Sequence, residues 1–321
     1  CPPPQPPAPR RRLHPRSSLP LGAMAALSAT VLRNLSDRAY DKRKAAALEI
    51  ESRVRDLVGA AGKFEGERDL RIDQVRETHD TSQSARSDID RILSTLAKDY
   101  AMSAQSNFRK GGLIGLAAAS LGLAHEAHLY LDVLLPPVLA CFSDQDSRVR
   151  YYACEALYNM AKVSRTKLLS KVNIIFEGLC RLCADTDQGV KNASQLLDKL
   201  LFDIVSESPS FPLDTFMPVL VAHLRLKNTL ARHFILGWTV NLLKHPSVDL
   251  ISYTPQMLEG LLAMLSDSSP EIRRQADAVL TTFLRGVERK DKDKASLNYS
   301  TLLPVLIRAA SNSKAGSRVE E

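Results

Sequence analysis

Few side chains in this 321-residue sequence combine the residue types and spacing that catalysis or metal binding requires. Cys180 and Cys183 have the Cys-x-x-Cys spacing of a zinc site, but no second pair of ligands accompanies them. His125 and His128 are three positions apart, whereas the helix of a metalloprotease places its two histidines four apart. No Ser/His/Asp set or carboxylate pair stands out. We therefore expect no metal, no cofactor, no catalytic residue and no enzymatic activity.

A glycine-rich stretch at 109–115, RKGGLIG, invites comparison with a phosphate-binding loop. It lacks the Gly-Lys-Ser/Thr ending of such loops, and no strand pattern precedes it. Glycine inside a helix costs about 1 kcal/mol relative to alanine. Three glycines within five residues therefore indicate a place where two helices approach closely, and a partner contact at this stretch is the alternative.

Basic residues recur at intervals of 41, each following an apolar residue. They could form a basic ridge that faces a partner or an anionic lipid surface. We favour an internal ladder, in which each base pairs with a turn aspartate of its own or an adjacent unit, because partly buried charges need partners. The contact should be weakest at Arg232, whose own turn lacks the aspartate. The predicted ladder comprises Arg109, Arg150, Lys191, Arg232 and Arg273, with Asp146 and Asp187 among the acids.

The same 41-residue interval organises the apolar residues that would position this ladder. Val149, Val190, Ala231 and Ile272 are equivalent, and each unit reads as an apolar helix, an Asp-rich turn and a second helix. A period in the low forties built from two helices is typical of HEAT and armadillo repeats. The turn followed by Val-Arg, as in 146–150, resembles HEAT repeats specifically. We predict an all-α HEAT-repeat solenoid of about six helix pairs, in which stacking buries each apolar face.

The chain divides by composition into segments. We expect the tail to be disordered because it is rich in proline and arginine, and Met24 to be a plausible natural start that makes the tail an upstream extension. The last unit ends after one predicted helix, so further repeats should be missing. The predicted segments are a tail at 1–23, a first HEAT unit at 24–61, a polar insert at 62–90, a HEAT array at 91–286 and an incomplete terminal repeat at 287–321.

Overall charge and cysteine usage narrow the function classes. The net charge is +7, and the tail holds four arginines and no acid, which leaves +3 for the remaining residues. Such a weakly basic body does not indicate nucleic-acid binding. Five cysteines, an odd number, without a secretory signal indicate reduced thiols in the cytosol. The longest apolar run, 111–124, is shorter than the roughly 20 residues that span a bilayer.

Three stretches, 40–52, 108–118 and 146–159, carry a more specific resemblance. Their sequences, YDKRKAAALEIES, FRKGGLIGLAA and DSRVRYYACEALYN, resemble the N-terminal repeats of the vacuole-morphology HEAT scaffold family of the phosphatidylinositol 3,5-bisphosphate kinase complex. The similarity runs from about residue 27 to about residue 286. As a hypothesis from this resemblance, the partner-binding residues are Phe108, Arg109, Lys110, Gly111, Gly112, Arg148, Arg150, Tyr151 and Tyr152.

The resemblance implies a non-enzymatic platform in the cytoplasm, peripheral on endosomal and vacuolar membranes through its partners. Its N-terminal repeats would bind the lipid kinase that phosphorylates phosphatidylinositol 3-phosphate, within the array at 91–286. Self-association and binding of the opposing Sac-domain phosphatase would need the C-terminal region of the family. The alternatives are another HEAT adaptor, such as a transport receptor or a phosphatase scaffold, and direct binding of an anionic membrane surface.

Overall fold

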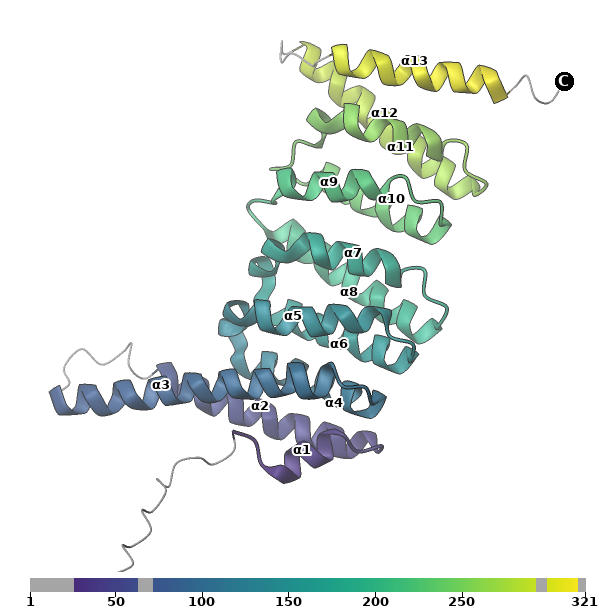
Figure 1. The fold of residues 1–321 in the computed structure, drawn as a ribbon. Helices are drawn as coiled ribbons and strands as arrows, with labels where there is room; N and C mark the ends of the chain where they lie inside the picture. The colour runs from purple at the N-terminus through teal and green to yellow at the C-terminus, as the bar shows by residue number, and fades with distance from the viewer. Residues whose placement is uncertain (1–25, 63–71, 293–298, 317–321) are drawn as a thin grey trace, which may run out of the picture.

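The computed structural model describes residues 26–62, 72–292 and 299–316. The predicted tail at 1–23, residues 63–71 of the predicted insert and residues 317–321 lie outside the described residues. Within the described ranges all regular elements are helical. They form a two-layered stack in which consecutive antiparallel pairs lie one above another (Figure 1).

Each pair consists of a first helix in one layer and a second helix in the other. The first helices are α1 (Ala29–Leu35), α3 (Ile72–Ser94, continued by the π-helical segment Thr95–Ala101), α5 (Leu131–Ala140), α7 (Val172–Leu182), α9 (Leu213–His223) and α11 (Thr254–Met264). The second helices are α2 (Tyr40–Gly62), α4 (Ser106–Leu123), α6 (Ser147–Ser164), α8 (Gln188–Glu207), α10 (Thr229–Lys244) and α12 (Pro270–Lys292). After the sixth pair, α13 (Tyr299–Gly316) packs on α11. Short 3₁₀ turns cover Ala124–Tyr130, Cys141–Ser143, Arg165–Lys171 and Leu250–Tyr253.

The second helices begin at the polar turns that the sequence marks. Asp146 caps α6 by accepting a hydrogen bond from the backbone amide of Arg148 at 2.9 Å. Asp187 caps α8 and Asn228 caps α10 in the same way, through amides three positions later at 3.1 and 3.0 Å. Each cap satisfies one of the amides that a helix N-terminus leaves unpaired.

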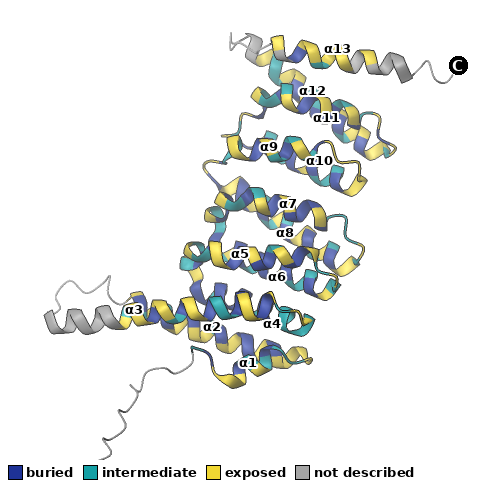
Figure 2. Cartoon of the chain, viewed as in Figure 1, coloured by how far each residue is buried: buried dark blue, intermediate teal, exposed yellow. Residues whose placement is uncertain are grey.

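The core follows the 41-residue period. Val149, Val190, Ala231 and Ile272 are all at most 3% exposed, each on the inner side of a second helix. Buried and exposed positions alternate around every pair, so the core runs along the stack between the two layers (Figure 2). The fold is therefore the predicted all-α HEAT-repeat solenoid, with six helix pairs in the described ranges.

The ends of α4 and α6 share an unusual backbone conformation. Ala124 has φ 49° and Arg165 has φ 46°, and the two residues are equivalent positions one period apart. Both lie where the second helix ends and the chain turns into the next unit. Positive φ at a residue with a side chain is strained, so the same strain repeats at successive junctions.

Aromatic side chains fill the junction between the fourth and fifth pairs. Trp238 of α10 is 1% exposed, and its ring centroid lies 5.0 Å from that of Phe202 of α8 and 5.4 Å from that of Phe176 of α7. Its indole Nε1 donates to Asp198 of α8 at 2.9 Å.

Candidate partner-binding surface

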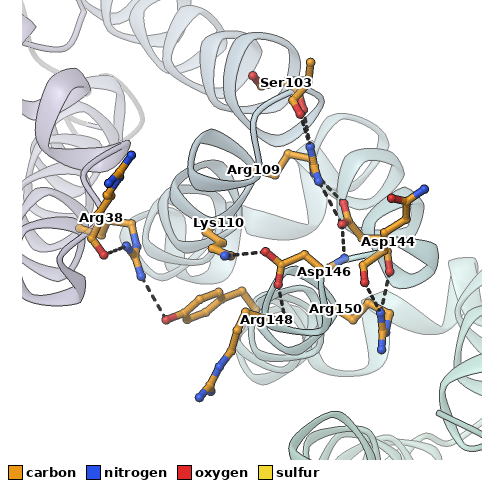
Figure 3. A network of polar contacts seen from close by, with 12 residues as sticks. Arg38, Ser103, Arg109, Lys110, Asp144, Asp146, Arg148 and Arg150 are labelled. Carbon is orange, nitrogen blue, oxygen red and sulfur yellow. Dashed lines mark hydrogen bonds and ion pairs between the residues drawn. The ribbon is translucent and has the colours of Figure 1, made fainter. Parts of the chain in front are cut away.

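Arginines at the start of the second helices form ion pairs that join consecutive units. Arg109 Nε and Nη2 donate to the carboxylate of Asp144 at 2.6 and 3.0 Å (Figure 3). Arg150 makes the same two contacts with Asp185 at 2.6 and 2.9 Å. The remaining nitrogen of each guanidinium, Nη1, donates to two backbone carbonyl oxygens in the turn before its own helix, at 2.7 to 3.2 Å. Each arginine therefore links its own turn to the turn of the following unit.

The direction of this pairing corrects the expectation for Arg232. We expected a weak contact there because the turn of its own unit lacks an aspartate. Instead Arg232 pairs with Asp267 of the following unit, and both side chains are largely buried. The missing rung is one unit earlier, at Lys191, because Leu226 occupies the position where the next aspartate would stand. No ion pair of Lys191 occurs among the described residues.

The ladder holds its carboxylates ionised. Burial opposes ionisation of Asp185, but the hydrogen bonds from Arg150 and from the Asp187 amide outweigh it and lower the pKa of Asp185. The hydrogen bond to Asp185 raises the pKa of the Arg150 guanidinium. Asp146 behaves in the same way: burial opposes its ionisation, and hydrogen bonds led by that from Lys110 lower its pKa.

The glycines of α4 lie inside the molecule. A Cβ atom at Gly111 would stand 2.0 Å from the carbonyl oxygen of Leu35, and one at Gly112 would stand 2.3 Å from the backbone nitrogen of Ala101. Both glycines are buried, so α4 packs directly on the backbone of neighbouring helices. This burial removes Gly111 and Gly112 from the candidate contact surface, a correction to the hypothesis that they touch a partner.

Three of the remaining predicted contact residues, Phe108, Lys110 and Arg148, lie near the ladder arginines at the starts of α4 and α6. Phe108 stacks on Tyr100 with ring centroids 5.2 Å apart, and Lys110 forms an ion pair with Asp146 at 2.6 Å. Arg148 is exposed, and its backbone amide serves the helix cap. Phe108 and Lys110 therefore make side-chain contacts within the fold, whereas no hydrogen bond or ion pair of the Arg148 side chain occurs in the part of the chain that the structure describes.

Tyr151 and Tyr152 are both half-buried on α6, and sequence reasoning missed what Tyr152 contacts. Arg43 of α2, 5% exposed, lies 5.9 Å from the ring centroid of Tyr40 and 5.8 Å from that of Tyr152. The two rings are nearly parallel, with centroids 6.4 Å apart. Arg43 also donates to the carbonyl oxygens of Asp37 and its neighbour at 2.8 Å, as the ladder arginines do in their own turns.

The described part of the chain shows little sign of metal or thiol chemistry. Its residues contain no group of three or more His, Cys, Asp or Glu side chains placed to hold a metal ion. The Cys183 thiol donates to the carbonyl oxygen of Cys180 at 3.1 Å within one helical turn. Burial raises the pKa of Cys141 to about 11 and that of Cys154 to about 12, which keeps these thiols protonated. Every helix in the described ranges is too short or too polar to cross a bilayer.

Fold and surface together define a HEAT-repeat solenoid protein whose internal charges are paired between units. Its similarity to known proteins narrows this class further: the chain belongs to the VAC14 family. A family described as the Vacuolar 14 Fab1-binding region matches residues 107–203. The protein VAC14 homolog of Arabidopsis thaliana is 43% identical over 290 residues, which cover 90% of this chain and 35% of that protein.

A second relative extends the similarity to fungi. Vacuole morphology and inheritance protein 14 of Saccharomyces cerevisiae is 34% identical over 313 residues, covering 85% of this chain and 33% of that protein. The chain thus spans about a third of the length of the curated relatives it matches. The matched region at 107–203 runs from α4 to α8 and contains the sequence-predicted contact residues from Phe108 to Tyr152.

Proposed function

We propose that this chain is a non-enzymatic scaffold that binds a Fab1-type lipid kinase, the enzyme that phosphorylates phosphatidylinositol 3-phosphate. One observation carries the proposal: the Fab1-binding family matches 107–203, the segment that forms α4 to α8. On the outside of this segment, Arg148 is exposed and Tyr151 is half-buried. An arginine beside aromatic rings is typical of the residues that anchor protein interfaces.

A rigid stack can promote a reaction without taking part in it. Holding the kinase at a fixed place raises its effective concentration towards other bound components, so that one binding event favours the next. In this role the chain supports phosphatidylinositol 3,5-bisphosphate synthesis, as a peripheral component of endosomal and vacuolar membranes. Self-association and binding of a Sac-domain phosphatase belong to the remaining two thirds of the family's length.

Pairing within the ladder favours a protein partner over an anionic lipid surface. The guanidinium groups of Arg109, Arg150 and Arg232 each hold a carboxylate of the following unit, and their side chains are at most 20% exposed. Such neutralised groups add little attraction for anionic lipid. The ladder therefore supports the stack, and we place the contact with the kinase beside it.

The proposal is tested by capture of the purified kinase on the immobilised chain. We expect wild-type chain to retain the kinase and Arg148→Glu to reduce retention by about tenfold. Arg274→Glu is the matched control, since Arg274 is 76% exposed on α12, outside the matched region. Loss of kinase capture by the wild-type chain itself would refute the function. Equal capture by Arg148→Glu would refute only the place of the contact.

A further inference from the structure

A groove lies between α6 and α8, on the helix that also carries Tyr152. It has a volume of 260 Å³. Tyr151, Glu155 and Tyr158 line it from α6 at positions i, i+4 and i+7, which fall on one face of a helix. Leu196 contributes from α8 and is 63% exposed, a large value for a leucine. The groove therefore combines two aromatic rings, one carboxylate and one exposed aliphatic side chain.

The carboxylate in this groove has no partner. Glu155 is exposed, and within the described ranges its side chain forms neither a hydrogen bond nor an ion pair, whereas the ladder carboxylates of Asp144 and Asp185 are each held by an arginine. Desolvation by the surrounding helix surface raises the pKa of Glu155, although the residue as a whole is exposed. Burial, and then the nearby Glu155 carboxylate, raise the pKa of Tyr151, which places the acid close to that ring. An exposed carboxylate that lies beside two aromatic rings and has no internal cation is open to a cation from a partner.

Two rings of α6 already hold a cation of this chain, one outside the groove and one in its lining. The Tyr152 ring holds the Arg43 guanidinium from α2 at 5.8 Å, and the Tyr158 ring holds the Lys162 ammonium at 5.8 Å. Aromatic faces attract cations in this distance range. The groove repeats the arrangement of rings and adds the Glu155 carboxylate, but no cation of the described residues forms an ion pair there.

We propose that the groove between α6 and α8 binds a segment of the partner protein that carries a lysine or arginine beside an apolar side chain. The cation contacts Glu155 and the ring of Tyr151, since the Tyr158 ring already holds Lys162, and the apolar neighbour covers Leu196. This inference rests on the proposed function, because the basic segment is taken to belong to the kinase that the region 107–203 is proposed to bind. Charge complementarity selects a basic segment over an acidic segment or an anionic lipid.

The test measures the affinity of the purified Fab1-type kinase for the full chain and its variants. Glu155→Lys reverses the charge, Glu155→Gln removes it with little change in shape, and Leu196→Ala truncates an exposed side chain that the fold does not need. Glu177→Lys is the matched control, because Glu177 is an exposed acid of α7 in the same matched region but in the other layer. Far-ultraviolet circular dichroism confirms that every variant is folded.

We expect Glu155→Lys to weaken kinase binding by about tenfold or more, and Glu155→Gln and Leu196→Ala to weaken it by about threefold each. Glu177→Lys should bind as the wild type does. Unchanged affinity of folded Glu155→Gln and Leu196→Ala would overturn the inference while the scaffold function stands. Tighter binding of Glu155→Lys would also overturn it, since an acidic partner or an anionic vesicle would then be the occupant. Failure of the wild type to bind the kinase would overturn the function and this inference together.

Discussion

The ladder offers a matched pair of substitutions, because Arg150 and Lys191 occupy equivalent positions and only Arg150 has an acidic partner. Arg150→Leu removes the bidentate ion pair with Asp185 and the two contacts to its own turn. Lys191→Leu removes a charge that has no carboxylate partner among the described residues. We expect a large loss of stability from the first substitution and a small one from the second.

The magnitude follows from the burial of the pair. Arg150 is 14% exposed and Asp185 is 7% exposed, so the charges are largely shielded from water. Removing one partner of a buried pair costs roughly 3–5 kcal/mol. Asp185 keeps a hydrogen bond from the Asp187 amide at 2.8 Å, which lowers the expected cost for Arg150→Leu to about 2–3 kcal/mol. For Lys191→Leu we expect about 0.5 kcal/mol or less, because the half-buried Lys191 side chain forms no ion pair within the described ranges.

Urea unfolding provides the assay, with circular dichroism for the helices and the fluorescence of the one tryptophan as probes. The pKa of Asp185 is lowered, so its stabilisation is present above about pH 4 and disappears as the pH falls through the folded pKa. The difference between the wild type and Arg150→Leu should therefore shrink below about pH 4. Equal destabilisation by Arg150→Leu and Lys191→Leu at pH 7 would refute the account of the ladder.

Three further predictions concern single positions. Burial raises the pKa of Asp198 to about 7, so the folded chain loses stability as the pH rises from about 4 to about 7. Asp198→Asn should flatten this decline, so its gain in unfolding free energy over the wild type should be on the order of 2 kcal/mol larger at pH 8 than at pH 5. Urea titrations followed by Trp238 fluorescence measure this difference. Ala124→Gly should raise the unfolding free energy by about 0.5–1 kcal/mol, because glycine adopts the positive φ without strain; an unchanged urea midpoint would contradict this. Leu226→Asp should supply the missing rung to Lys191 and stabilise by up to about 1 kcal/mol, a gain that a double-mutant cycle with Lys191→Leu should abolish.

The period alone predicted the architecture, because each helix pair must bury the same side of its second helix. Val149 and its equivalents were identified from spacing, and they are among the most buried residues of the stack. The bases of the ladder were identified in the same way. Their partners were not, since the acid of each rung comes from the following unit, 35 residues later, and the sequence does not reveal which turn a side chain faces.

Long-range contacts account for the other features that sequence reasoning missed. Tyr152 and Arg43 are 109 residues apart, and the segment between the first two units breaks the 41-residue interval that would have aligned Arg43 with the ladder. The glycines of α4 signalled close packing, but only the position of Leu35 and Ala101 against them shows that they are inaccessible. The pocket of Glu155 depends on how α6 lies against α8, which no pattern within α6 specifies.

Hydrogen exchange of the chain with and without the purified Fab1-type kinase tests the central claim most directly. If the second-helix face of α6 and α8 binds the kinase, amides at 148–159 and 189–196 should exchange more slowly in the complex, with little change in α10 and α12. Slower exchange confined to α9 through α13, or no change at saturating kinase, would contradict the claim that this surface holds the kinase.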